Sequence, residues 1–161
     1  MKGFIIIMGI IFLALIGFAC WCWYYTSGPG ETFIQTCHYG PDYSPDPLCT
    51  PGDKGVVDLK IICAPAKYDA KISKALTREV FGRYGINDTS NYRIDNLVPL
   101  ELGGSNNIRN LYPQPISSPG FNEKNIAEQK LHDIVCANKM PLNSAQQMIM
   151  FNWKTNEGLW R

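Results

Sequence analysis

The sequence predicts an α+β fold behind one N-terminal transmembrane helix, and three observations predict it. An uncharged apolar run covers residues 4–25 and sets the start of the chain apart from the rest. Two short segments of strand-like composition, residues 92–100 and 108–112, flank a Gly-Gly turn. Segments with helical spacing of apolar residues precede and follow this pair. In a chain of 161 residues, this leaves enough sequence for one compact domain.

Residues 4–25 form the predicted membrane segment. About 20 apolar residues without a charge match the hydrocarbon thickness of a bilayer. The run ends in four aromatic residues, which favour the membrane–water interface: Trp21, Trp23, Tyr24 and Tyr25. The only flanking charge is Lys2, which predicts that the N-terminus stays inside. Residues 1–25 are therefore interpreted as a retained anchor or uncleaved signal, with the domain in the periplasm or outside the cell.

A cleaved signal peptide is the alternative, and it would make the protein secreted. Gly17 and Ala19 are small residues at positions −3 and −1 before Cys20, as a cleavage site requires. The apolar run continues past Cys20, which favours the retained anchor.

Residues 26–48 are rich in Pro, Gly, Ser and Tyr and are interpreted as a linker. The predicted domain covers residues 49–161. Within it, residues 56–64 suit either a short strand or a short helix. Residues 69–84 predict a helix, because apolar residues recur there every four positions: Ile72, Leu76 and Val80.

Two further helices are predicted after the strand pair, over residues 122–138 and 142–153. Each places apolar residues on one face. These are Ala127, Leu131, Ile134 and Val135 in the first helix, and Leu142, Ala145, Ile149 and Trp153 in the second.

Four of the six cysteines lie in the predicted linker and domain. Export would place them in an oxidising compartment, where an even number favours disulfides. Of the three possible pairings, we favour Cys37–Cys49 together with Cys63–Cys136. A zinc site is the alternative, but this part of the chain has no CxxC pair.

Charge argues against nucleic-acid binding by bulk electrostatics, because the net charge is only +1. Binding of nucleic acid would then depend on a local basic patch. Four basic residues recur at three- and four-residue spacing and would form one stripe on a helix: Lys67, Lys71, Lys74 and Arg78. Such a stripe can follow a phosphate backbone or rest on anionic lipid headgroups, although a solvated helix face is the simpler interpretation.

The segment around the Gly-Gly turn, residues 92–113, reads YRIDNLVPLELGGSNNIRNLYP. It resembles the centre of bacterial HNH endonuclease domains, which typically read Asp-His, a proline, a Gly-Gly turn, Asn-Leu and then a helix. Four further motifs are similar to a small exported subgroup of that family: CTPG at residues 49–52, YGI at 84–86, Lys124 with Glu128, and LH–VC across 131–136. Their order extends the resemblance over residues 49–153.

The resemblance implies an HNH-like ββα-metal core of hairpin plus helix, with flanking helices, one divalent metal ion and a nucleic-acid substrate, DNA being favoured. Asp95 falls on the metal-ligand position of the first strand. Asn122 falls on the ligand position of the helix. Asn110 falls on the middle Asn, which ties the hairpin together and orients the base.

Asn96 stands where the family has its catalytic His. A carboxamide cannot accept a proton from water, so the general base of the reaction is missing. Arg93 also stands where an acidic residue is usual, and Asn125 where Asp is usual. His132 lies about three helical turns beyond Asn122, too far to replace the base, so a surface or packing role is expected for it.

Three functions are therefore open. The first is a membrane-tethered, metal-dependent endonuclease of weak activity. The second is an inactive pseudonuclease that binds nucleic acid, or a protein partner that the sequence does not identify. The third is a disulfide-stapled surface module without a nucleic-acid role, which a net charge near zero favours.

Overall fold

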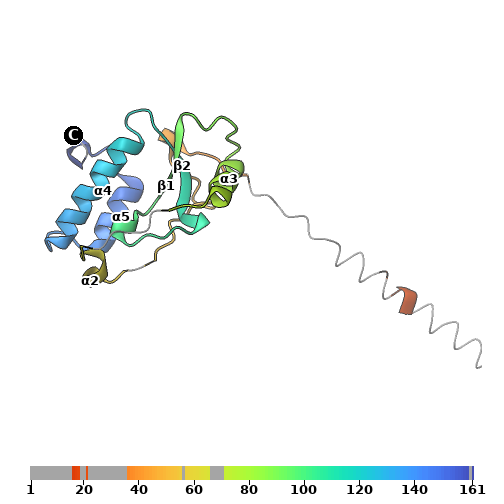
Figure 1. Cartoon of the computed structure of the whole chain (residues 1–161), viewed down its shortest axis with the longest axis horizontal. Coiled ribbons are helices and arrows are strands. Elements are labelled where there is room, and N and C mark those ends of the chain that lie inside the picture. The colour runs from red at the N-terminus through yellow and green to blue at the C-terminus, as the bar shows by residue number, and fades with distance from the viewer. Residues whose placement is uncertain (1–15, 19–20, 22–35, 56, 66–70, 160) are drawn as a thin grey trace, which may run out of the picture. The chain divides into compact units, whose positions relative to one another are not determined.

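The computed structural model describes residues 16–18, 21, 36–55, 57–65, 71–159 and 161. The chain divides into two compact units, Met1–Ile34 and Gln35–Arg161. Most of the predicted membrane segment lies outside the described residues, and so does Lys67. No helix in the described part of the chain is both long and apolar enough to cross a bilayer. Figure 1 shows the elements of the second unit, called the body below.

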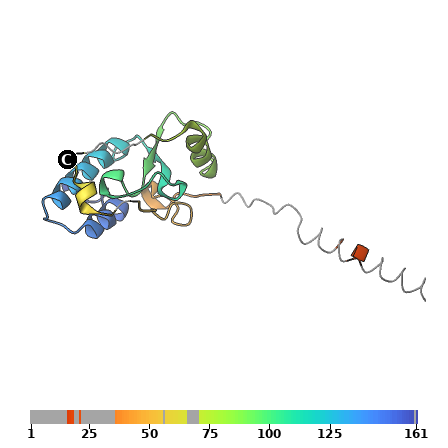
Figure 2. The ribbon, with the colours of Figure 1, turned by 60° about the horizontal axis from the view of Figure 1, so that its bottom comes forward.

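The body is a mixed α+β fold, as the sequence predicts. Its strands and α-helices follow in the order α2 (Leu59–Ile62), α3 (Lys74–Arg83), β1 (Tyr92–Asn96), β2 (Leu111–Pro115), α4 (Phe121–Cys136) and α5 (Leu142–Phe151). The two strands form one antiparallel sheet. Figures 1 and 2 place this hairpin between α3 on one side and the α4–α5 pair on the other.

The second strand runs to Pro115, three residues past the end predicted at residue 112, because its prolines suit the register. Tyr92 pairs with Pro115, and Ile94 pairs with Pro113. Just past the end of β1, Leu97 N–H donates to Asn110 O at 2.7 Å. Hydrogen-bonded pairs alternate along an antiparallel ladder, so Tyr92–Pro115 and Ile94–Pro113 are the pairs without hydrogen bonds. The prolines therefore occupy positions whose amide points away from the partner strand.

The connection between the strands is ordered by two 3-10 turns, Leu100–Leu102 and Ile108–Asn110. Gly104 is required between them. A Cβ at this position would lie 1.8 Å from the Val98 carbonyl oxygen. The predicted Gly-Gly turn is thus a close backbone approach that folds this connection against the end of β1.

The main hydrophobic core lies between α4 and α5. Its buried members come from both helices, from the connection between the strands and from the C-terminal end: Leu102, Ala127, Leu131, Val135, Ala145, Ile149, Trp153 and Leu159. The core faces predicted for the two helices are confirmed, except that Ile134 and Leu142 are only half-buried. This packing fixes α4 relative to the hairpin.

The helix predicted over residues 69–84 begins later, at Lys74. Ser73 caps it, because its Oγ accepts a hydrogen bond from Leu76 N at 3.2 Å. Lys71 precedes the helix and is exposed. The expected stripe of four residues on one helix is corrected accordingly, since only Lys74 and Arg78 of the described residues lie on α3, where both are exposed.

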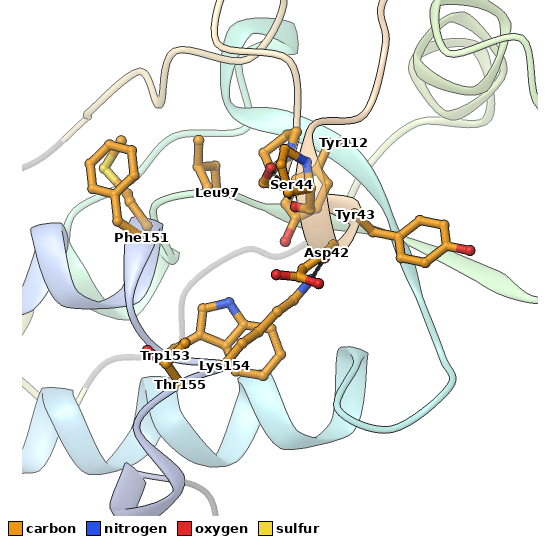
Figure 3. A pocket seen from close by; sticks show the side chains of 12 residues that line it. Asp42, Tyr43, Ser44, Leu97, Tyr112, Phe151, Trp153, Lys154 and Thr155 are labelled. Carbon is orange, nitrogen blue, oxygen red and sulfur yellow. Dashed lines mark hydrogen bonds between the residues drawn. The ribbon is translucent and has the colours of Figure 1, made fainter.

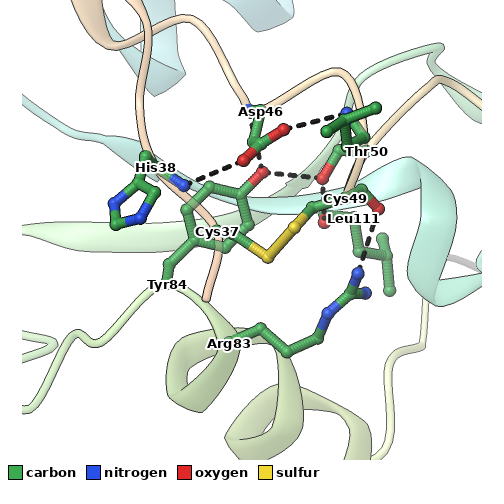
Figure 4. The surroundings of a disulfide bond; sticks show 9 residues. Cys37, His38, Asp46, Cys49, Thr50, Arg83, Tyr84 and Leu111 are labelled. Atoms are coloured by element: carbon green, nitrogen blue, oxygen red, sulfur yellow. Dashed lines mark hydrogen bonds between the residues drawn. A yellow bond between two sulfur atoms is a disulfide. The ribbon is translucent and has the colours of Figure 1, made fainter. Parts of the chain in front are cut away.

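The two predicted disulfides, Cys37–Cys49 and Cys63–Cys136, are both present. Around the first, Tyr84 Oη and Thr50 Oγ1 are hydrogen-bonded at 2.7 Å, and Arg83 donates to Cys49 O at 3.2 Å (Figure 4). Residues 36–48, which the sequence placed in the linker, are part of the compact unit that forms the body. The two disulfides indicate an oxidising environment outside the cytoplasm.

Candidate functional site

The end of β1 and the first turns of α4 meet at a buried ionic cluster. Asp95, on β1, is only 7% exposed. Its Oδ2 lies 3.0 Å from Lys124 Nζ, whose side chain is completely buried. Lys124 Nζ also donates to Asn96 O at 2.7 Å and forms an ion pair with Glu128, one turn later on α4. The cluster thus joins the hairpin to the helix.

Burial and charge compete within this cluster. Burial disfavours the charged form of Lys124, but the carboxylates of Asp95 and Glu128 outweigh it, so the pKa of Lys124 is raised. Burial is also the largest influence on Glu128, whose pKa is raised, and the nearby Asp95 charge adds to this effect. Two carboxylates share a single ammonium, so the cluster carries net negative charge when all three groups are ionised.

One oxygen of this cluster, Asp95 Oδ2, is held only by its ion pair with Lys124. Among the described residues, Asp95 Oδ2 and Gln114 Nε2 are the buried side-chain polar atoms that have no hydrogen-bond partner. Asp95 Oδ2 lies 3.0 Å from Lys124 Nζ and forms an ion pair with it. The other carboxylate oxygen, Asp95 Oδ1, accepts a hydrogen bond from Asn96 N at 2.8 Å. A metal ion bound at Asp95 Oδ2 would therefore share this oxygen with the Lys124 ammonium.

A cavity of about 210 Å³ lies beside the cluster. Oxygen-bearing side chains from three elements line it: Asp95 and Asn96 from β1, Glu101 from the first 3-10 turn, and Asn125 and Glu128 from α4. Carboxylate and amide oxygens are the ligands that hard divalent cations prefer. With three carboxylates around it and one buried ammonium nearby, the cavity is suited to a cation.

The helix contributes Asn125 to this cavity and not Asn122. Asn122 is the second residue of α4, is exposed and does not line the cavity. Phe121 does line it, and one helical turn of 3.6 residues leads from Phe121 to Asn125. The helix start is fixed by Glu123, whose side chain accepts from Gly120 N at 2.8 Å. In the sequence, the four-residue spacing of Lys124 and Glu128 indicated that these two side chains lie on the same face of the helix.

Asn110 ties the connection between the strands together, the structural part of the role that the resemblance implies for it. Its side chain is completely buried. Asn110 Oδ1 accepts from Val98 N at 2.9 Å, and Nδ2 donates to Val98 O and Ser105 O, each at 2.8 Å. These bonds satisfy backbone groups that the strand ladder does not reach.

Asn96 is held by the same connection. Its Nδ2 donates to Ser105 O at 2.8 Å and to Asn106 Oδ1 at 3.2 Å. Ser105 O therefore receives hydrogen bonds from the side chains of both Asn96 and Asn110. Asn96 lines the cavity beside Asp95, but its amide offers no basic group there.

A second cavity of about 310 Å³ lies between the end of α5 and residues 41–45. Its walls are largely aromatic and aliphatic, with Trp153, Leu97 and Tyr112 among them (Figure 3). Lys154 Nζ donates to Asp42 O at its edge. Asp42 is the one carboxylate that lines this cavity among the described residues, so a divalent-cation site is not assembled here.

The structure also brings together a group that the sequence separated. His132 Nε2 lies 3.5 Å from Cys136 Sγ, and Cys63, His132 and Cys136 together form a group that could hold a metal ion. Cys63 and Cys136 form a disulfide here. The i, i+4 spacing of His132 and Cys136 was the available sequence signal, but the position of Cys63 depends on tertiary structure.

The chain matches no protein-family model, no curated protein and no solved structure.

Proposed function

We propose that the body is an HNH-like ββα-metal domain that binds a divalent cation and a nucleic-acid phosphate, and that it hydrolyses phosphodiesters slowly or not at all. The observation that carries the proposal is the cavity itself, which brings the side chains of Asp95, Glu101 and Glu128 together with the amides of Asn96 and Asn125. Asp95 and Asn125 are the proposed ligands. Asn125 takes the ligand role for which the sequence favoured Asn122.

A divalent cation in this cavity would neutralise charge on the phosphate and stabilise the leaving oxygen. Asn96 occupies the position from which a base would take a proton from water. Its amide is not basic, and its Nδ2 is already bound to Ser105 O. Lys124 lies 3.0 Å from Asp95 Oδ2 and competes electrostatically with a bound cation, so the affinity for the cation is low.

The exposed basic residues on α3, Lys74 and Arg78, are the proposed contacts to the nucleic-acid backbone, with DNA as the favoured substrate. Lys71 lies just before the helix and extends the same basic segment. An alternative function, a pseudonuclease that only binds nucleic acid or protein, rests on the loss of the base at Asn96.

The ligand assignment is tested by Mn²⁺ binding to the full chain, followed by electron paramagnetic resonance. Asn125→Ala is expected to weaken Mn²⁺ binding about tenfold or more, because it removes one of few protein oxygens from a weak site. The matched control is Asn122→Ala, an equally exposed position on the same helix, which is expected to bind like the wild type. The opposite order would assign the ligand to Asn122, and no Mn²⁺ binding by the wild type would refute the cation site.

We also propose that residues 4–25 anchor the chain in the membrane with the body outside the cytoplasm. The uncharged composition of this segment and the two disulfides of the body support the proposal. Protease added to intact cells is expected to digest the body while a cytoplasmic marker stays intact. A body that is protected until the cells are lysed would contradict this topology.

A further inference from the structure

The Cys63–Cys136 disulfide has a histidine beside it. His132 and Cys136 lie one turn apart on α4, so their side chains share one face of the helix. Cys63 is the C-terminal cap of α2, and the disulfide to Cys136 holds it against this face of α4. One ligand atom from each of the three residues lies within 4.8 Å of the others. The group could hold one ion after the sulfur–sulfur bond is broken and the two sulfurs move apart to tetrahedral spacing.

The three side chains are a donor set for zinc and not for magnesium or calcium. Two thiolates and an imidazole match the soft and borderline ligands that bind Zn²⁺, and three protein ligands leave the fourth tetrahedral position for water. The cavity beside Asp95 offers only oxygen ligands, so the two sites differ in the class of cation they take.

The surroundings of His132 suit a metal ligand. Its second ring nitrogen, Nδ1, lies 3.5 Å from Asp133 Oδ1. Histidines that bind metals commonly direct their other N–H to a carboxylate, which leaves the ligating nitrogen with its lone pair. In the disulfide form Nε2 lies 3.1 Å from Ile62 O, where it acts as a donor. Metal binding would move the imidazole proton from Nε2 to Nδ1.

We propose that Cys63, His132 and Cys136 form a redox-gated zinc site, closed by the disulfide and opened by its reduction. A dithiol reductant transfers two electrons and two protons to the Cys63–Cys136 bond and is itself oxidised to a disulfide. The sulfur–sulfur bond breaks and leaves two thiols. Binding of Zn²⁺ then releases the two thiol protons to solvent, and both thiolates and His132 Nε2 coordinate the ion. A disulfide oxidant then accepts two electrons from the two thiolates and two protons from solvent and becomes a dithiol, while the Cys63–Cys136 bond reforms and Zn²⁺ is released.

The bound ion would preserve the same structural link as the disulfide. Cys63 and Cys136 are 73 residues apart in sequence and join α2 to the end of α4. Zinc held by both cysteines keeps these elements together after the covalent bond is reduced. The proposed site is independent of the cation site beside Asp95, because the two share no residue.

The test uses the full chain with Cys20→Ser and Cys22→Ser, which removes the remaining thiols outside the body. Zn²⁺ binding is measured before and after reduction with a dithiol, and Co²⁺ serves as the spectroscopic probe of thiolate ligation. The reduced chain is expected to bind one equivalent of Zn²⁺ through this site, with the absorption of tetrahedral, thiolate-bound Co²⁺, whereas the oxidised chain binds neither ion here. Equal binding by the two forms would overturn the proposal.

His132→Gln is the decisive variant, because it keeps both cysteines and therefore the disulfide of the oxidised protein. It is expected to weaken Zn²⁺ binding by the reduced chain by more than about tenfold. His38→Gln, at the other histidine of the chain, is the matched control and is expected to leave the affinity unchanged. Unchanged affinity in His132→Gln would refute the site, and so would a reduced wild type that unfolds and stays unfolded when Zn²⁺ is added. Neither result depends on Mn²⁺ binding near Asp95.

Discussion

Asn96→His is expected to raise the rate of phosphodiester cleavage by about 10²–10⁴, the usual contribution of a general base. The backbone is already arranged for this substitution. Asn96 Nδ2 donates to Ser105 O at 2.8 Å, and the Nδ1–H of an imidazole can make the same bond. The other ring nitrogen, Nε2, is then the free base beside Asp95. Nicking of supercoiled plasmid in the presence of Mg²⁺ or Mn²⁺ measures the gain.

Two controls separate the base from other effects of this substitution. Asn96→Ala removes the same amide without adding a base and is expected to stay as slow as the wild type. The Asn96→His, Asp95→Ala double variant is expected to lose the gain, because the cation loses its charged ligand. Robust wild-type cleavage that survives Asp95→Ala would contradict the account. A folded, cation-loaded Asn96→His protein that cuts nothing would favour the pseudonuclease.

Lys124→Met is expected to lower the free energy of unfolding by about 3–5 kcal/mol near neutral pH, because it leaves buried carboxylates without their ammonium partner. The Lys124 side chain is completely buried between Asp95 and Glu128, so both carboxylates depend on it for charge compensation. Chemical denaturation monitored by circular dichroism measures the change. Lys130→Met is the matched control on the same helix, since the Lys130 ammonium donates exposed hydrogen bonds to Gly158 O and Arg161 O. It is expected to change stability by less than about 1 kcal/mol.

The loss in Lys124→Met is expected to depend on pH. The folded-state pKa of Glu128 is raised even in the wild type, mainly by burial, and removal of Lys124 raises it further. Between the ordinary carboxyl pKa and this raised value, the folded state binds more protons than the unfolded state, so stability falls as pH rises. The deficit should therefore shrink as pH is lowered towards the ordinary carboxyl range. Adding Glu128→Gln to Lys124→Met should recover part of the loss, and a deficit that is the same at every pH would contradict this electrostatic explanation.

Most of the fold could be predicted from hydrophobic periodicity. The two C-terminal helices occur within two residues of the predicted bounds, because their apolar faces pack on each other in one core. Two elements differ for local reasons. Ser73 caps α3, which begins five residues after the predicted start, and Pro113 fits β2 because its missing N–H faces away from β1.

The candidate site was only partly predictable. Asp95 and Asn96 line the cavity, and Asn110 braces the connection behind it, as the motif around the Gly-Gly turn indicates. On α4 the cavity is lined by Asn125 and not by Asn122, although the helix begins within one residue of its predicted start. The buried position of Lys124 could not be foreseen either, since lysines at helical spacing are usually solvated.

The central claim, that a divalent cation binds between β1 and α4, is tested most directly by nuclear magnetic resonance of the wild-type full chain titrated with Mn²⁺. A bound paramagnetic ion broadens the resonances of nearby nuclei. The claim predicts that broadening is strongest at the backbone amides of Asp95, Asn96 and Asn125, and that Mg²⁺ reverses it by competition. Broadening centred on other surface carboxylates, with these amides unaffected at saturating Mn²⁺, would contradict it.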